Sequence, residues 1–81
     1  MVKWWVLLFS LLISQYAIAI VNINSATLEE LQTVKGIGPS KAEAIIQYRN
    51  TNGKFISIHE LQRIKGFGTK TVAKIESQIT I

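Results

Sequence analysis

The chain has 81 residues, a formal net charge of +4 at pH 7 and no cysteine. A chain of this length forms at most one small domain, and without cysteine it forms neither a disulfide framework nor a thiolate metal site. The single histidine, His59, cannot build a zinc site or a catalytic triad alone. We therefore expect no metal and no cofactor. The moderate positive charge fits a partner with phosphates or another anionic surface.

Residues 1–19 differ in composition from the rest of the chain. Lys3 is their only charged residue, an apolar stretch follows it, and the segment ends in Ala17-Ile18-Ala19. This order is typical of a secretory signal peptide with small residues at the cleavage site. The sequence predicts cleavage after Ala19, which leaves a domain of residues 20–81. The alternative is an uncleaved membrane anchor, although the apolar stretch is short for a span and polar residues interrupt it.

The predicted domain begins with an extended lead-in, Val21-Asn22-Ile23-Asn24, and a short helix. Thr27 and Glu30 have the spacing of a capping box, in which each side chain accepts a hydrogen bond from the other residue's backbone. The apolar residues of this helix recur at helical spacing and predict one buried face. They are Leu28, Leu31 and Val34.

A glycine pair separates this helix from the next. Gly36 and Gly38 bracket Ile37, and Pro39 follows at a position suited to the first turn of a helix. Glycine tolerates a positive φ, so it can end one helix and reverse the chain while Ile37 packs between the helices. The second helix is predicted from residues at helical spacing, and residues 50–53 are expected to end it. These spaced residues are Ala42, Ile45, Ile46 and Arg49.

The same arrangement recurs 30 positions later. Ser57 and Glu60 suggest a second capping box, and Gly66 and Gly68 bracket Phe67 as the first pair brackets Ile37. When residues 30–45 are compared with 60–75, seven of sixteen are identical, which indicates a duplicated helix–turn–helix unit. The apolar positions of the second unit are Ile58, Leu61 and Ile64 in its first helix and Val72, Ile75 and Ile79 in its last.

Neither unit can bury its apolar face alone. We expect the two units to pack around a pseudo-twofold axis, with both glycine turns on one side. Each turn leads into a helix whose first N–H groups lack partners, which favours an anion near the turn. Lys41, Lys70 and Lys74 then indicate phosphate contacts, whereas Lys35 and Lys65 either contact phosphate or complete the end of the preceding helix.

The aromatic residues of the predicted domain are Tyr48, Phe55 and Phe67. Phe55 and Phe67 fit a core, which leaves no stacking platform for single strands. Two neighbouring turns instead fit a duplex, with one turn on each strand across a minor groove. The candidate nucleic-acid-binding residues are Lys35, Gly36, Ile37, Gly38, Ser40, Lys41, Lys65, Gly66, Phe67, Gly68, Thr69, Lys70 and Lys74.

An enzyme is not expected from this sequence. Glu30 and Glu60 have capping roles, while Glu43 and Glu76 are single carboxylates on predicted helix surfaces. No pair of carboxylates indicates acid–base chemistry, and the glycine pairs are too short for a nucleotide-binding loop. We expect no catalytic residue and no small-molecule substrate.

Residues 31–38, Leu-Gln-Thr-Val-Lys-Gly-Ile-Gly, resemble the helix-hairpin-helix signature. Together with other segments, they are similar to the ComEA family of competence DNA receptors over residues 21–81. This resemblance implies an all-α fold, a tandem helix-hairpin-helix of four short helices in a pseudo-twofold SAM-like bundle. The other segments are Val21–Ala26, Glu30-Leu31, Ala42–Ile46, Tyr48-Arg49, and Asn52-Gly53 with Phe55.

The resemblance also implies a function. It implies binding of double-stranded DNA without sequence preference in the periplasm, during DNA uptake for natural transformation. Its partners would be double-stranded DNA and proteins of the DNA-uptake pore or the inner-membrane DNA channel. The alternative is a helix-hairpin-helix module of the cell envelope that binds a protein or another anionic polymer.

The second unit departs from the family pattern. Phe67 stands where isoleucine or leucine is usual, and Thr69 where proline is common. The lysines also differ between the units, because Lys41 corresponds to Thr71 and Lys70 to Ser40. This shift of one residue turns the lysine by roughly 100° around the helix, so we expect the two turns to hold phosphate differently.

Overall fold

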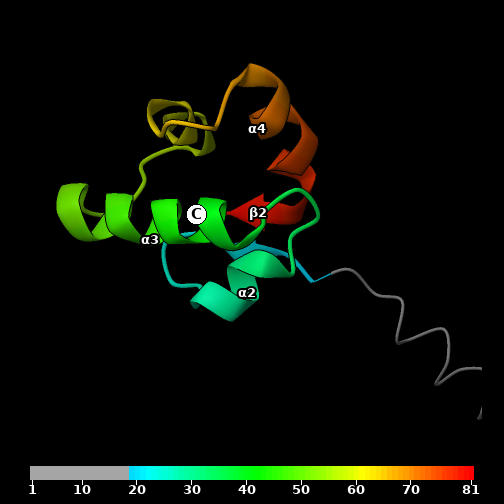
Figure 1. Ribbon diagram of the computed structural model, residues 1–81, viewed down its shortest axis with the longest axis horizontal. Coiled ribbons are helices and arrows are strands. Elements are labelled where there is room, and N and C mark those ends of the chain that lie inside the picture. Colours follow the sequence, from blue (N-terminus) through cyan, green and yellow to red (C-terminus); the bar gives the residue numbers. More distant parts are fainter. Residues whose placement is uncertain (1–18) are drawn as a thin grey trace, which may run out of the picture.

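The computed structural model describes residues 19–81 (Figure 1). The predicted signal peptide lies outside these residues except for Ala19. The expected fold is confirmed: four short helices dominate the described part, with one small parallel strand pair. Within residues 19–81, no helix is both long and apolar enough to cross a membrane. The elements are β1 (Val21–Asn22), α2 (Leu28–Gln32), α3 (Pro39–Asn52), the 3₁₀ helix η1 (Ile58–Arg63), α4 (Thr69–Ile75), the 3₁₀ turn η2 (Glu76–Gln78) and β2 (Ile79–Thr80).

The first capping box is confirmed. The Thr27 hydroxyl accepts a hydrogen bond from the Glu30 amide at 3.1 Å, and the Glu30 carboxylate accepts one from the Thr27 amide at 3.1 Å. Both bonds satisfy N–H groups that a helix start would leave without partners. The helix packs as predicted, with Leu31 and Val34 buried and Leu28 partly buried.

The second capping box is wrong. Ser57 makes no side-chain cap, and Glu60 accepts its backbone hydrogen bond from Ile56 instead, at 3.0 Å. The other Glu60 oxygen accepts a hydrogen bond from the Tyr48 hydroxyl at 3.0 Å. Because η1 is a 3₁₀ helix and Tyr48 of α3 draws the carboxylate toward itself, Glu60 does not reach back to Ser57.

Helix α3 begins at Pro39 as predicted but continues through most of the segment expected to break it. It ends at Asn52, where Gly53 reverses the backbone with a φ of +86°. Near its end the Arg49 guanidinium donates hydrogen bonds to the carbonyl oxygens of Ile23 and Ala26, at 2.9 and 2.7 Å. Arg49 therefore fixes the N-terminal lead-in to α3.

The prediction that Ile79 belongs to the last helix is wrong. Helix α4 ends at Ile75, η2 follows, and Ile79 lies in β2, which pairs in parallel with β1. In this register Val21 is opposite Ile79, and the Ile23 amide donates to the Thr80 carbonyl at 3.0 Å. Ile79 is still buried, because the strand pair places it against the core. The extended lead-in and the end of the chain thus meet (Figure 1).

The two units bury the same positions. Leu31, Val34, Ile37, Ala42 and Ile45 are buried, and so is the residue 30 positions after each of them. Of the fifteen positions from 31 to 45, only Ala44 differs in burial class from its counterpart, Lys74, which is exposed. The duplication seen in the sequence is therefore also a duplication of packing, around one shared core.

Candidate nucleic-acid interface

The two glycine turns have the same backbone conformation. Gly36 has a φ of +110° and Gly66 a φ of +99°, a region that residues with a side chain rarely adopt. In each turn an amide donates three residues back: Ile37 to the Val34 carbonyl and Phe67 to the Ile64 carbonyl, both at 3.0 Å. The sequence prediction of two equivalent reversals is confirmed.

The apolar residue of each turn belongs to the core. Ile37 is 4% exposed and Phe67 is 2% exposed. Their amides donate hydrogen bonds within the turns. Ile37 and Phe67 therefore support the turns from inside, and their predicted contact with nucleic acid stays a prediction.

The helix starts that follow the turns offer unpaired N–H groups. Gly38 and Gly68 cap α3 and α4 without any side-chain hydrogen bond. Within residues 19–81, nothing accepts from the amides of Gly38, Ser40 and Lys41, or from those of Gly68, Thr69, Lys70 and Thr71. The first amide used after each turn is that of Ala42 or Val72, which donates to the capping glycine. Each helix start can therefore accept an anion.

Gly38 and Gly68 lie in open space. Among residues 19–81, an added Cβ would meet nothing within 4 Å at either position, and neither residue has a positive φ. The free protein therefore gives no steric reason for glycine there. A ligand that approaches the backbone closely would supply that reason.

The predicted lysines surround these turns. Lys35, Lys65, Lys70 and Lys74 are exposed and Lys41 is partly buried. The two hydroxyl residues of the predicted set, Ser40 and Thr69, are exposed at the two helix starts. Lys35 lies three residues after the end of α2 and Lys65 two residues after the end of η1, and both roles predicted for these two lysines stay predictions.

Lys74 lies closer to the first turn than its sequence position suggests. Its Cδ and Cε atoms are each 3.9 Å from the place where a Cβ on Gly36 would stand. The stem of Lys74 therefore runs along the first turn, although the residue belongs to α4 of the second unit. The sequence grouped Lys74 with Lys70, and this contact across the units was missed.

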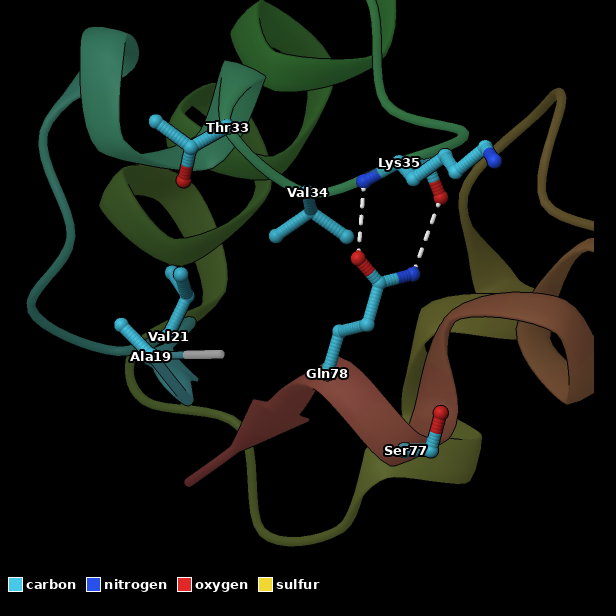
Figure 2. A pocket seen from close by; sticks show the side chains of 7 residues that line it. All are labelled: Ala19, Val21, Thr33, Val34, Lys35, Ser77 and Gln78. Atoms are coloured by element: carbon cyan, nitrogen blue, oxygen red, sulfur yellow. Dashed lines mark hydrogen bonds between the residues drawn. The ribbon is translucent and has the colours of Figure 1, made fainter. Parts of the chain in front are cut away.

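The surroundings of the two turns differ. A Cβ on Gly36 would lie 3.1 Å from Ile75 Cγ2, whereas one on Gly66 would meet nothing within 4 Å. The Gln78 side chain also contacts the first turn, where it accepts from the Lys35 amide at 2.9 Å and donates to the Lys35 carbonyl at 3.1 Å (Figure 2). Sequence reasoning missed Gln78, and its only signal was a departure from the repeat, since Tyr48 stands 30 positions earlier.

A pocket of about 490 Å³ lies next to Gln78. Its walls come from the start of the described chain, from the end of α2 with the first turn, and from η2 (Figure 2). The residues that line it are Ala19, Val21, Thr33, Val34, Lys35, Ser77 and Gln78. The Lys35 side chain points away from this space (Figure 2), so its ammonium group remains outside the pocket.

The aromatic residues of the described chain face inward or one another. Phe55 and Phe67 are buried, and the rings of Tyr48 and Phe55 stack with centroids 5.1 Å apart. Tyr48 is partly exposed, but its ring is already stacked on Phe55 and its hydroxyl is bonded to Glu60, so residues 19–81 offer no fully exposed aromatic ring for a base to stack upon. This arrangement favours contacts to a phosphate backbone over contacts to unpaired bases.

Comparison with known proteins identifies the family. A family model described as the helix-hairpin-helix motif matches residues 17–80. The chain belongs to the helix-hairpin-helix family. The expectation of this family, drawn from the two glycine turns, is therefore confirmed.

Several curated proteins are similar to this domain. ComE operon protein 1 of Bacillus subtilis (strain 168) is 57% identical over 63 residues, which are 78% of this chain and 31% of that protein. An uncharacterized protein of Haemophilus influenzae is 44% identical over 59 residues, 72% of this chain and 53% of that protein. The chain thus spans about a third and about half of the length of these two relatives. The similarity to the ComE operon protein agrees with the predicted resemblance to ComEA and supports DNA binding.

A third relative has a different name. Endonuclease/exonuclease/phosphatase family domain-containing protein 1 of Rattus norvegicus is 37% identical over 59 residues, 73% of this chain but 10% of that protein. Such a small share of the relative transfers the helix-hairpin-helix domain and no activity. Helix-hairpin-helix membership supports a binding role for this chain.

Proposed function

We propose that this protein binds double-stranded DNA without sequence preference, during DNA uptake for natural transformation. Membership in the helix-hairpin-helix family and the similarity to ComE operon protein 1 support this proposal. The observation that carries it is the pair of turns with one backbone conformation, each followed by unpaired helix N–H groups. Both turns are attached to one shared core, so the domain can contact a duplex at two points at once.

The chemistry of the turns explains the lack of sequence preference. Backbone N–H groups and lysine ammonium groups contact phosphates, which are the same for every base pair. Residues 34–41 and 64–71 contain no arginine, asparagine or glutamine, whose bidentate contacts read base edges in the major groove. The protein would therefore position itself on the backbone and ignore the sequence.

We further propose that the domain works outside the cytoplasm. The Ala17-Ile18-Ala19 motif supports secretion into the periplasm through a cleaved signal peptide, with an uncleaved anchor as the alternative. There the domain would hold incoming DNA beside the uptake pore or the inner-membrane DNA channel. The intact mass of the protein recovered from the cell envelope tests cleavage, since a full-length species in the membrane fraction would support the anchor.

Salt-dependent binding tests the main proposal. Residues 20–81 should bind two unrelated duplexes of equal length with equal affinity, and a single strand more weakly. If lysines and amides contact four to six phosphates, log Kd against log salt should have a slope of about 4 to 5 in magnitude. A flat salt response, or a strong preference for one sequence, would contradict the proposal.

The same titration separates the alternative function. A cell-envelope module that binds any anionic polymer should bind heparin as well as a duplex of the same charge density. A duplex-specific protein should prefer the duplex, because the proposal places one turn on each of its two phosphate strands. Equal affinity for both polymers would favour the alternative.

A further inference from the structure

Gln78 makes a contact that no other side chain of residues 19–81 makes. It is the one side chain there that hydrogen-bonds the backbone of either glycine turn, and it uses both ends of its amide (Figure 2). The Lys35 amide has no other acceptor among the described residues. Two bonds to one residue fix both the distance and the orientation of the Lys35 backbone.

This contact connects the first turn to the second unit. Gln78 is the last residue of η2, which follows directly on α4, and α4 begins at the second turn with Gly68 as its N-cap. Ile75 of α4 also lies beneath Gly36. The position of the first turn relative to the second is therefore set through α4 and η2, by contacts to Gly36 and to Lys35.

The second turn lacks such a contact. Tyr48 occupies the position that corresponds to Gln78, and its hydroxyl donates to Glu60 instead. Gly66 has nothing within 4 Å of an added Cβ, and the Lys65 amide has no acceptor within residues 19–81. The two turns thus share a conformation, but a side chain restrains only the first.

We propose that Gln78 is a positioning residue for duplex binding, which holds the first turn at a fixed distance from the second. This inference rests on the proposed binding of double-stranded DNA. A two-point grip gains more affinity when the second contact forms without further ordering, and a restrained turn lowers that ordering cost. Gln78 acts through the Lys35 backbone, to which its amide oxygen and its amide nitrogen each make one hydrogen bond.

Amide hydrogen exchange tests the contact without DNA. In the unaltered chain the Lys35 amide should exchange roughly 10-fold or more slowly than the Lys65 amide, its counterpart in the second turn. In Gln78→Ala this protection should disappear, while amides inside α3 stay protected. The matched control is Gln62→Ala, which removes an exposed glutamine side chain that makes no hydrogen bond within residues 19–81. A Lys35 amide that exchanges as fast as that of Lys65 in the unaltered chain would overturn the inference.

Binding to a random duplex tests the role of the contact. Gln78→Ala should weaken binding roughly 3- to 10-fold, and Gln62→Ala should not change it. If Gln78 acts through the first turn, the double variant Gln78→Ala with Lys41→Glu should weaken duplex binding by less than the product of the two single fold-changes. Combining Gln78→Ala with Lys70→Glu, in the second unit, should also lose less than the product, because the distance between the turns matters only while both hold the duplex. A residue that merely stabilised the fold would give the full product in both cases and would overturn the inference.

A second variant keeps the test valid if Gln78→Ala fails to fold. Gln78→Met keeps the unbranched stem but removes both hydrogen bonds, and it should weaken binding as Gln78→Ala does. Unchanged duplex binding by either folded variant would overturn the positioning role alone. Absence of duplex binding by the unaltered chain would overturn the proposed function and this inference together, even if the Lys35 amide remained protected.

Discussion

Gly36 and Gly66 show how far two residues in equivalent turns can differ. Both have a positive φ, so both need the freedom of glycine. Gly36 also lies against Ile75, whereas Gly66 faces open space. A side chain at position 36 therefore meets backbone strain and a steric clash, and one at position 66 meets backbone strain alone.

We expect Gly36→Ala to destabilise the domain more than Gly66→Ala. Strain at a positive φ costs about 1 kcal/mol or more for each variant, and the contact of 3.1 Å with Ile75 Cγ2 adds to it at position 36. Thermal denaturation of the two variants measures the difference. Gly38→Ala is the control, because nothing lies within 4 Å of its Cβ position, and it should change the melting temperature least. Equal melting temperatures for Gly36→Ala and Gly66→Ala would contradict this prediction.

The carboxylate of Glu60 makes the stability of the domain depend weakly on pH. The hydrogen bond from the Ile56 amide is the main cause that lowers the pKa of Glu60. Partial desolvation opposes the shift, and the Tyr48 hydroxyl and the Arg63 charge add to it. A carboxylate with a lowered pKa stabilises the fold above its unfolded pKa, and the effect is lost as the pH falls through the folded pKa.

The expected result is that Glu60→Gln reduces the melting temperature at neutral pH and that this deficit shrinks below the usual pKa range of glutamate. Melting curves from neutral pH to pH 3 measure it. Glu43→Gln, which changes an exposed carboxylate without a hydrogen bond in residues 19–81, should show no such trend. A deficit that stays constant with pH would show that the charge of Glu60 has no role.

At the level of elements, the starts of α3 and α4 present their lysines differently. Lys41 is partly buried in the third position of α3, whereas Lys70 is exposed in the second position of α4. Lys74 lies one helical turn after Lys70, and its stem runs along the first turn. The positive charge near the two turns therefore comes more from α4 than from α3.

Charge reversal tests both helix starts. Lys41→Glu and Lys70→Glu should each weaken duplex binding by about 1–3 kcal/mol, because each loses an attraction and adds a repulsion. We expect Lys70→Glu to weaken binding more than Lys41→Glu, because the new carboxylate also offsets the positive charge of Lys74. The double variant should show no detectable binding. Lys54→Glu makes the same change in net charge in the exposed loop before η1 and should have a smaller effect.

The two single variants also test whether both turns contact DNA. If Lys41→Glu is harmless and Lys70→Glu abolishes binding, the first turn is structural and the two-point grip is wrong. Circular dichroism of each variant checks that the helices persist.

For the whole molecule, the parallel strand pair joins the two ends of the described domain. Strands β1 and β2 bring Val21 and Ile79 together, and Arg49 and Gln78 attach the lead-in and η2 to the rest of the fold. A domain this small has a thin core without disulfides, so such connections carry a large share of its stability.

Ile79→Ala should therefore destabilise the domain by about 2–4 kcal/mol, the usual cost of truncating a buried isoleucine. Small domains have only a few kcal/mol to lose, so urea denaturation should show a much earlier midpoint. Ile81→Ala is the matched control, because Ile81 is 42% exposed whereas Ile79 is 4% exposed. If both variants unfolded at the same urea concentration, burial of the Ile79 side chain would contribute nothing to stability.

Local pattern in the sequence determined most of the fold and the position of the candidate site. The repeat of 30 residues, the turn glycines, the Thr27 capping box and the buried apolar positions depend on residues a few positions apart, whose spacing and backbone preferences act directly. Tertiary structure alone decided the rest. It placed Ile79 in a strand instead of a helix and directed the Glu60 carboxylate away from Ser57. It also placed the Gln78 side chain against Lys35, which is 43 residues away in the sequence. These outcomes depend on which distant backbone or hydroxyl group offers a hydrogen bond once the core has formed, and no local pattern carries that information.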